Sequence, residues 1–424
     1  MKVLLSHSAG NQNVRAMLDA LTRAGLLARF ATTVAADENS AMLRLMPAGV
    51  RRDWLRRRFD VPREKILQHR WRELARVICG GAGWRSALRH EQGFASLDAV
   101  IQDFDRFVAR SLSSVQRREP LGAVYAYEDG ALDTFRAAGA LGLKRIYDLP
   151  IAYWELGHRL QQEEAERLPD WAATLGGGLV DSRAKLARKT QELELADLVV
   201  VASTFVRDSL PASAAHKAIV MSPFGSPARW TEGWSQAALD PARPMRVLFA
   251  GSMGQRKGLA DLFAAMKLLA GENIELVVLG SLMESMEFYR GQYAGFTHEK
   301  SRPHAEVLAL MRSCDVFCLP SIVEGRALVM QEAMSQGLPV VITPNTGGAD
   351  LVVEGRTGFL VPIRSPQKIA EKLSWLNQHR AELVAMKEEA ARHSASYSWT
   401  AYGDTVVDAI RRLEGAKPAV AASI

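Results

Sequence analysis

The stretch over residues 315–362 constrains the fold most, because it predicts a strand, a loop and a helix twice in succession. An apolar run at 316–319 predicts a buried strand, and a loop carrying Glu324 follows it. Residues 327–336 have the apolar spacing of a helix, and residues 340–343 predict the next buried strand. Repeated units of this kind build a parallel sheet, so an α/β fold is expected. Such sheets bind ligands at the carboxyl ends of their strands.

Two carboxylates flank the start of this predicted helix. Glu324 lies in the loop, and Glu332 lies on the helix, eight residues further along the chain. Between Ala327 and Glu332 the helix advances only about 7–8 Å, at about 1.5 Å per residue. The helix N-terminus also favours a bound anion. An extended ligand with an anionic middle could therefore contact both carboxylates, and a nucleotide sugar has that layout.

The segment EGRALVMQEAMSQGLPVV, residues 324–341, resembles the donor-site signature of glycosyltransferase family 4, retaining enzymes of the GT-B fold. The resemblance implies two Rossmann-like parallel-sheet domains that face a cleft, and a C-terminal helix that crosses back to the N-terminal domain. It implies that Glu324 positions the donor sugar and that Glu332 binds the ribose. The donor-binding residues implied here are Gly325, Arg326, Ala327, Leu328 and Glu332. A generic Rossmann unit with two incidental glutamates is the alternative.

A second loop, GSMGQRKG at residues 251–258, follows a predicted strand at 245–250. Its spacing approaches that of a P-loop, but Arg256 and Gly258 stand where that motif requires glycine and a hydroxyl residue, which excludes an ATPase of that type. The loop instead resembles the family loop whose basic residues bind the donor diphosphate, which implies that role for Arg256 and Lys257. A basic surface turn is the alternative. The other donor-site residues implied are Gly251, Ser252 (where relatives carry arginine) and Gly280.

The expected chemistry requires no metal ion. Cleavage of the bond between sugar and diphosphate leaves a dianionic nucleotide, whose charge must be stabilised. Arg256, Lys257 and the helix N-terminus after Glu324 could stabilise it, so no cofactor is expected beside the nucleotide-sugar co-substrate. Asp103 and Asp105 imitate the Asp-x-Asp metal motif of other glycosyltransferases, but the helical pattern around them indicates surface carboxylates.

Arg326 has two possible roles. It lies in the first turn of the predicted helix, where a cation opposes the helix dipole at a cost of about 0.3–1 kcal/mol unless an anion lies nearby. The residue is therefore either a further phosphate contact or a side chain that points into solvent.

The N-terminal half also alternates predicted strands and helices. The loop after its first strand contains Gly10, but it lacks the paired glycines that family members place near the donor phosphate. At the end of the strand at 145–148, where relatives often carry a His-Asp or His-Asn pair, this chain has Tyr147 and Asp148. Asp148, or His158 ten residues further on, is the tentative contact to the transferred sugar. A structural role is the alternative for each.

The chain length of 424 residues predicts two domains. The region at 37–118 is expected to be mainly helical, and the loop region at 296–304 is where relatives position the nucleotide base. The predicted parts are an acceptor-side domain at 1–226, a linker at 227–244, a donor domain at 245–394, a returning helix at 395–414 and a disordered tail at 415–424.

Positive charge is concentrated in one stretch. The net charge is +6, and residues 44–76 alone hold eleven Arg and Lys against four Asp and Glu, a surplus of 11 − 4 = +7. Trp54, Leu55, Phe59 and Trp71 lie among these basic residues. Such a mixture predicts contact with an anionic membrane surface, and a solvated helix face is the alternative. Nothing else in the chain favours nucleic acid as a partner.

Together these features predict a retaining glycosyltransferase of the hexosyltransferase type, which moves a sugar from a nucleoside-diphosphate sugar to a glycan or lipid-linked acceptor. Bacterial-type surface polysaccharide synthesis is the expected setting. A cytoplasmic location is expected, because no apolar run reaches membrane-spanning length and the N-terminus enters a strand at once. Membrane contact by the basic stretch would place the protein at the inner leaflet. The alternatives are a nucleotide-sugar 2-epimerase of GT-B fold and a non-catalytic GT-B binding subunit.

Overall fold

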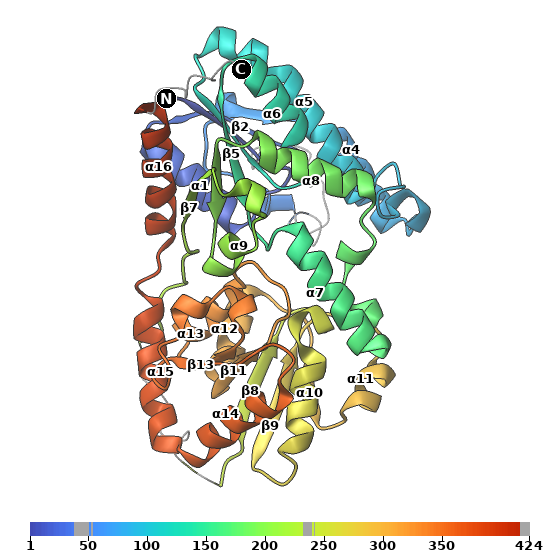
Figure 1. The fold of residues 1–424 in the computed structure, drawn as a ribbon, viewed down its shortest axis with the longest axis vertical. Coiled ribbons are helices and arrows are strands. Elements are labelled where there is room, and N and C mark those ends of the chain that lie inside the picture. Colours follow the sequence, from blue (N-terminus) through green and yellow to red (C-terminus); the bar gives the residue numbers. More distant parts are fainter. Residues whose placement is uncertain (38–50, 52–53, 232–239, 241, 416–424) are drawn as a thin grey trace.

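The computed structural model describes residues 1–37, 51, 54–231, 240 and 242–415, and Figure 1 shows that they form two stacked parts. Each part holds one parallel sheet with helices packed against it. The first sheet has the strand order β3-β2-β1-β4-β5-β6-β7, and the second has the order β10-β9-β8-β11-β12-β13. The predicted α/β fold with two parallel sheets is confirmed.

The first part begins with β1, and its central strands β1, β4 and β6 are buried along their whole length. This burial is typical of a parallel sheet that helices cover on both faces. Its strands are β1 (Val3–Ser6), β2 (Leu27–Thr32), β3 (Ile66–Gln68), β4 (Ala123–Tyr127), β5 (Lys144–Leu149), β6 (Leu198–Val201) and β7 (Ala218–Met221). Its helices are α1 (Gln12–Arg23), α4 (Trp71–Gly81), α5 (Leu97–Arg118), α6 (Leu132–Ala140), α7 (Trp154–Arg167), α8 (Arg183–Leu195) and α9 (Thr204–Asp208).

The second part contains the stretch at 315–362 as β11, α13, β12 and β13. Its strands are β8 (Met245–Ala250), β9 (Ile274–Leu279), β10 (Phe296–Glu299), β11 (Val316–Leu319), β12 (Val340–Ile342) and β13 (Gly358–Leu360). Its helices are α10 (Leu259–Leu268), α11 (Met286–Gln292), α12 (His304–Arg312), α13 (Leu328–Ser335), α14 (Pro366–Gln378) and α15 (Arg380–Ser394).

Three edge strands differ from the sequence-based expectation. β3 lies within the region at 37–118 that was expected to be mainly helical, β10 lies within the expected loop at 296–304, and β13 was not expected. Each has only three or four residues, too few for an apolar period to be recognised. Their backbone pairs with a longer neighbour, as β10 pairs with β9, so tertiary pairing decides their conformation.

The last helix, α16 (Trp399–Gly415), returns to the first part, as predicted. Figure 1 shows α16 beside α1. Tyr402, Val406 and Ile410 are buried in the core of the first part. Gly403 allows the close crossing, because a Cβ added there would lie 2.4 Å from Cβ of Ala20. The predicted helix that crosses back is therefore confirmed.

A segment of the predicted acceptor-side domain packs into the other half of the molecule. Trp171, after α7, is 3% exposed and belongs to the core of the second part. Its ring makes edge contacts with Phe263 at 5.9 Å and Phe288 at 5.0 Å between centroids. The backbone N–H of Gln255 donates to Oγ1 of Thr174 over 2.9 Å. The segment around Trp171 therefore belongs to the second part by packing, although it precedes the linker in sequence.

The Asp-x-Asp pair does not lie on the surface as the sequence predicts. Asp105 is fully buried, and its carboxylate accepts hydrogen bonds from the backbone N–H groups of Asp133 at 2.8 Å and Thr134 at 2.9 Å. Arg188 pairs with the same carboxylate. The prediction is therefore wrong for Asp105, which holds the first turn of α6, while Asp103 is partly exposed.

The basic stretch is only partly on the surface. Most residues between 44 and 53 lie outside the described part of the chain. Phe59 is 8% exposed and packs in the core of the first part. Nη2 of Arg57 lies 2.6 Å from Oε1 of Glu73, which is buried. Phe59 is therefore not available to a membrane and Arg57 is held in an ion pair, whereas Trp71 is exposed.

Two further predictions fall on residues that the structure does not describe. Residues 232–239 and 241 of the predicted linker, and residues 416–424 of the predicted tail, lie outside the described part. Among the helices that are described, none is long and apolar enough to cross a membrane.

Candidate active site

Glu324 lies at the centre of the candidate site, in the loop between β11 and α13. Its side chain is largely buried, and Oε1 lies 2.9 Å from Nη1 of Arg256 and 2.5 Å from Nζ of Lys257. The two cations come from the turn before α10, which approaches the β11 loop closely. A Cβ added to Gly258, whose φ is +76°, would lie 2.0 Å from the carbonyl oxygen of Pro320. Two loops therefore bring together the three residues that carry the predicted chemistry.

A pocket of about 390 Å³, called here the C-domain pocket, lies at the carboxyl ends of β8 and β9 and beside the N-terminus of α13. Gly280 lets these strands approach, because a Cβ added there would lie 1.8 Å from the carbonyl oxygen of Gly251. The predicted residues that line the pocket are Gly251, Ser252, Lys257, Gly280, Ala327 and Leu328. Ser301 and Arg302 also line it and fall in the region at 296–304 where the resemblance places the nucleotide base, whereas Ser281 is a polar lining residue that the sequence analysis missed. Ser281 directly follows Gly280, and that position was the available signal.

Glu332 lies one helical turn along α13 from the start of the helix. Its Oε1 lies 3.1 Å from Nε2 of His304, the first residue of α12. The carboxylate is partly exposed, at 23%. Glu332 is therefore near the C-domain pocket but is held toward α12.

Arg326 has neither of the two predicted roles. Its side chain is fully buried, and Nη1 lies 2.7 Å from a carboxylate oxygen of Asp350. Its Nε donates to Oε1 of Gln331 over 2.9 Å. Its guanidinium also lies over the ring of Tyr397, at 5.1 Å from the centroid. Arg326 therefore ties the start of α13 to later elements, and contact with phosphate or solvent is excluded by its burial.

The loop that carries Glu324 also touches the first part of the molecule. The backbone N–H of Ala152 donates to the carbonyl oxygen of Glu324 over 3.3 Å. Oγ of Ser203 donates to the carbonyl oxygen of Gly325 over 2.7 Å. A Cβ added to Gly325 would lie 1.7 Å from the carbonyl oxygen of Pro150, so glycine is required for this approach.

A second pocket, of about 220 Å³ and called here the interdomain pocket, lies on the other side of Arg256. Arg256 and Val323 line it from the second part of the molecule. The polar and aromatic lining residues of the first part include Glu128, Trp154, His158, Gln161 and Lys189. Arg256 thus reaches the interdomain pocket while its Nη1 contacts Glu324, and Lys257 contacts the same carboxylate from the C-domain pocket. The predicted residue His158 lies at this pocket.

Two buried oxygens in the interdomain pocket lack hydrogen-bond partners. Oε1 of Gln161 and Oε1 of Glu128 have none among the described residues, although Nζ of Lys189 lies 3.4 Å from Glu128. Burial raises the pKa of Glu128 to about 7, an effect that Lys189 partly opposes. Buried acceptors without donors are costly, so a ligand with hydroxyl groups would satisfy them. The sequence offered no signal for either residue.

Asp148 does not reach either pocket. Its Oδ2 accepts a hydrogen bond from the hydroxyl of Tyr125 over 2.6 Å and another from the hydroxyl of Tyr402 over 3.3 Å. Burial raises the pKa of Asp148 to about 7, against the effect of these hydroxyls. Its contacts make it a structural residue that ties β5 to β4 and α16.

Gly10 also lies outside the lining of both pockets. A Cβ added to it would lie 2.3 Å from Cε1 of Phe59. The neighbouring His7 packs edge-on against Tyr127 at 4.7 Å between centroids, and burial lowers the pKa of His7 to about 4. Gly10 therefore allows close packing within the first part of the molecule.

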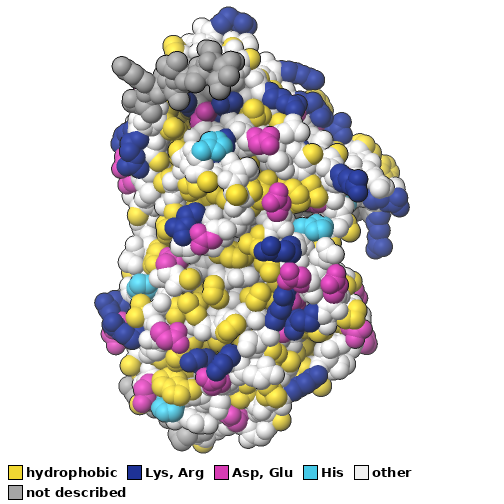
Figure 2. Space-filling view, viewed as in Figure 1, with side chains coloured by type: hydrophobic (Ala, Val, Ile, Leu, Met, Phe, Trp, Pro, Cys, Tyr) yellow, Lys and Arg dark blue, Asp and Glu magenta, His cyan; other side chains and the backbone are white. Residues whose placement is uncertain are grey.

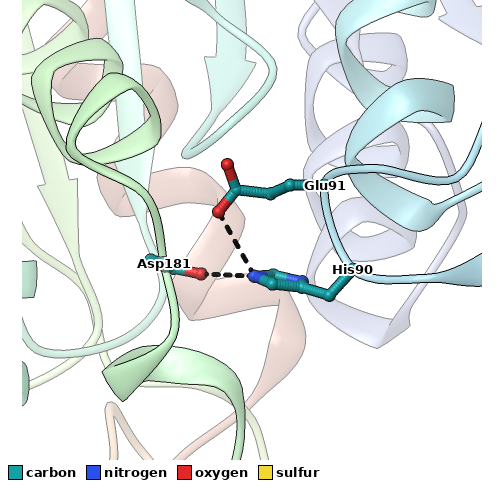
Figure 3. A group of neighbouring side chains, drawn as sticks. All are labelled: His90, Glu91 and Asp181. Carbon is teal, nitrogen blue, oxygen red and sulfur yellow. Dashed lines mark hydrogen bonds and ion pairs between the residues drawn. The ribbon is translucent and has the colours of Figure 1, made fainter.

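One group of side chains in the described residues has the mutual spacing of metal ligands. It consists of His90, Glu91 and Asp181, and Figure 3 shows Nε2 of His90 pointing toward both carboxylates. Nζ of Lys185 already lies 2.9 Å from Oδ1 of Asp181. The backbone N–H of Ser182 donates to Glu91 over 2.8 Å. These partners satisfy the carboxylates, so the group joins two loops and is not assigned to a metal.

The second part of the chain is similar to known proteins. Residues 231–393 match the family described as Glycosyl transferases group 1. A D-inositol 3-phosphate glycosyltransferase of Corynebacterium efficiens is 30% identical over 53% of this chain and 55% of its own length. YqgM of Bacillus subtilis, described as an uncharacterized glycosyltransferase, is 29% identical over 70% of this chain and 78% of its own length. The matches span 24% to 55% of the length of three D-inositol 3-phosphate glycosyltransferases.

Solved structures are similar over nearly the whole chain. Sucrose-phosphate synthase from Thermosynechococcus elongatus superposes with a TM-score of 0.63 at 16% identity, covering 98% of this chain and all of that one. Anabaena Alr3699/HepE, solved in complex with UDP and glucose, has a TM-score of 0.60 at 14% identity, covering 97% and 99%. These similarities confirm the predicted GT-B fold.

Proposed function

We propose that this protein is a retaining, metal-independent glycosyltransferase that moves a sugar from a nucleoside-diphosphate sugar to a glycan or lipid-linked acceptor. The observation that carries the proposal is the carboxylate of Glu324, held by Arg256 and Lys257 between two pockets. One pocket has the size and polarity for a nucleotide, and the other could hold a sugar ring. The match to Glycosyl transferases group 1 supports the same reaction class.

In this proposal the donor diphosphate lies in the C-domain pocket, between Lys257 and the N-terminus of α13. Departure of the nucleotide concentrates negative charge on the β-phosphate. Lys257 and Arg256 are preorganised by Glu324 to stabilise that charge, and a single contact of this kind is worth about 10²–10³ in rate. Glu324 also positions the sugar, and Glu332, with His304 beside it, binds the ribose.

The acceptor is proposed to lie in the interdomain pocket. Trp154 offers an apolar ring surface there. Oε1 of Gln161, which has no partner among the described residues, can accept a hydrogen bond from a sugar hydroxyl, and so can the carboxylate of Glu128 beside Lys189. Arg256 lines this pocket and contacts Glu324, so an acceptor hydroxyl here would lie beside the donor sugar. The attack and the departure then occur on the same face of the sugar, which retains its configuration.

The proposed setting is surface polysaccharide synthesis at the inner leaflet of the plasma membrane. One relative, WcaL of Escherichia coli, is described as a putative colanic acid biosynthesis glycosyltransferase and is 26% identical over 38% of this chain. A lipid-linked or growing glycan acceptor would be presented at that surface.

The first test is a thermal-shift panel of UDP, GDP, ADP and dTDP sugars. UDP sugars come first, because HepE was solved with UDP and glucose. Product analysis with the sugar that stabilises the protein then identifies the reaction. Release of nucleoside diphosphate with a glycosylated product supports the proposal, whereas a new sugar nucleotide would identify a 2-epimerase instead.

Metal independence has its own test. We expect transfer to continue in EDTA, because Arg256 and Lys257 supply the positive charge at the diphosphate. Loss of turnover in EDTA with recovery on adding magnesium or manganese would contradict this part of the proposal. In that case Asp103 and the group at His90 and Asp181 would be the first candidates to examine.

A further inference from the structure

Helix α4 carries its apolar residues on the outside. Trp71 is 76% exposed and Ile78, seven residues later on the same face, is 63% exposed. The opposite face holds Glu73, which is buried and paired with Arg76 at 2.7 Å and Arg57 at 2.6 Å. A surface helix of a globular protein normally turns its apolar stripe toward the core. The outer face of α4 is therefore apolar while its inner face holds the charged Glu73 beside Cys79, an inversion expected for a helix whose outer face meets an apolar phase.

The apolar surface continues beyond α4 into the segment before α5. Nη1 of Arg72 donates to the carbonyl oxygen of Phe94 over 2.6 Å, which places Phe94 beside the first turn of α4. At the other end of the helix, the backbone N–H of Trp84 donates to the carbonyl oxygen of Cys79 over 2.9 Å. The exposed residues of this surface, called here the aromatic patch, are Trp71, Val77, Ile78, Trp84, Phe94 and Leu97. The other large exposed hydrophobic residues in the described chain are scattered between 180 and 353.

The charges around the aromatic patch have one sign. Between residues 70 and 97 the charged side chains that are exposed are Arg70, Arg85 and Arg89. The two acidic side chains of this segment are engaged within the protein. Glu73 is buried in its ion pairs, and Glu91 accepts hydrogen bonds from Ser182. Figure 2 shows basic side chains around apolar ones at the edge of the molecule formed by this region.

We propose that the aromatic patch is a membrane-docking surface for an anionic lipid bilayer. Tryptophan and phenylalanine insert at the boundary of headgroups and acyl chains, and arginines near an anionic leaflet are attracted to its negative surface potential. A second copy of this chain fits less well, since a twofold interface pairs the same patch from both copies and would bring two sets of Arg70, Arg85 and Arg89 together without acidic partners. The charge around the patch therefore selects an anionic surface as its partner.

The patch is tied to the interdomain pocket. Nε2 of His90, in the segment between Trp84 and Phe94, lies 3.0 Å from Oδ1 of Asp181 (Figure 3). Asp181 lines the interdomain pocket. A membrane at the patch would thus lie against the segment that is bonded to the wall of the proposed acceptor site. This link rests on the proposed function, whereas docking itself rests only on the surface.

Vesicle sedimentation with the full chain tests the proposal. We expect pelleting with vesicles that contain phosphatidylglycerol, weaker pelleting at high salt, and little with phosphatidylcholine alone. The double variant Trp84→Ser/Phe94→Ser should bind these vesicles about tenfold or more weakly, because two exposed aromatic side chains are lost from the apolar contact. The triple variant Arg70→Ser/Arg85→Ser/Arg89→Ser should lose the part of the vesicle binding that weakens at high salt.

The matched control is Leu268→Ser, which removes a side chain that is 57% exposed on α10 of the other part of the molecule. It should bind vesicles like the unaltered protein, and circular dichroism should show that every variant is folded. Equal binding by the double variant, or no binding by the unaltered protein, would overturn the proposal. If the unaltered protein and Leu268→Ser form a dimer and the patch variants are monomers, a second copy is the occupant of the patch instead. Vesicle binding without nucleotide-sugar binding would refute the proposed function and leave this inference standing.

Discussion

At the scale of single residues, Glu324 and Lys257 are expected to matter most for turnover. Glu324→Gln weakens the ion pairs that orient both cations, and Lys257→Ala removes positive charge from the C-domain pocket. Each change should lower the transfer rate about a hundredfold or more while the protein stays folded, the range seen when one transition-state contact is lost. Steady-state kinetics and melting temperatures measure both effects. Asp103→Asn is the matched control, and near-normal turnover in both site variants would end the assignment.

Asp148 leads to a prediction about pH and stability. Its pKa is raised by burial from its ordinary value of 3.8 to about 7, so the folded protein keeps this proton where the unfolded chain has lost it. The contribution of Asp148 to the free energy of unfolding therefore falls as pH rises from about 4 to about 7. It falls by about 1.4 kcal/mol for each pH unit and is constant above that range. Glu128 acts in the same direction.

Asp148→Asn isolates this contribution, because asparagine keeps an oxygen that can accept from Tyr125. The variant should lose less stability between pH 4 and pH 7 than the unaltered protein. Urea unfolding across this range measures the difference, and parallel curves for the two proteins would show that Asp148 does not titrate in it.

At the scale of elements, the loop between β11 and α13 joins the two parts of the molecule. Gly325→Ala would place a Cβ 1.7 Å from the carbonyl oxygen of Pro150, so the two loops must separate. Because Arg256 and Glu324 lie at this contact, we expect a loss of transfer of about tenfold or more with little change in secondary structure. Gly291→Ala is the control, since an added Cβ there meets nothing within 4 Å. Full activity in Gly325→Ala would show that the close approach is not needed for turnover.

At the scale of the whole molecule, Trp171 connects the first part of the chain to the core of the second. Trp171→Ala should lower the free energy of unfolding of the second part by about 3–5 kcal/mol, the usual cost of truncating a buried aromatic residue. Calorimetry should show a lower transition temperature for that part. Trp84→Ala is the matched control, because Trp84 is 60% exposed and its removal should change stability little. Equal melting of the two variants would show that the Trp171 packing is dispensable.

Local patterns in the sequence determined most of the architecture and the centre of the site. Strands such as β4, β8 and β11 are apolar throughout and bounded by loops, so their period and length are visible without a structure. Glu324 and Lys257 were assigned to one site by the resemblance of their two loops to the family's donor-site loops, and the parallel sheet is consistent with that assignment. The carboxyl ends of parallel strands meet at one edge of the sheet, so residues that follow different strands converge there.

The tertiary structure alone decided what each polar residue faces. Asp105 and Arg326 look exposed in sequence, but partners 28 and 24 residues away bury them in ion pairs and hydrogen bonds. Gln161 and Glu128 are 33 residues apart and line one pocket, at which α7 also contacts the second part of the molecule through Glu164 and Gln255. The inverted face of α4 follows from Arg57, which holds Glu73 inward. Burial depends on what packs against a residue from elsewhere in the chain, and no local pattern of a single sequence carries that information.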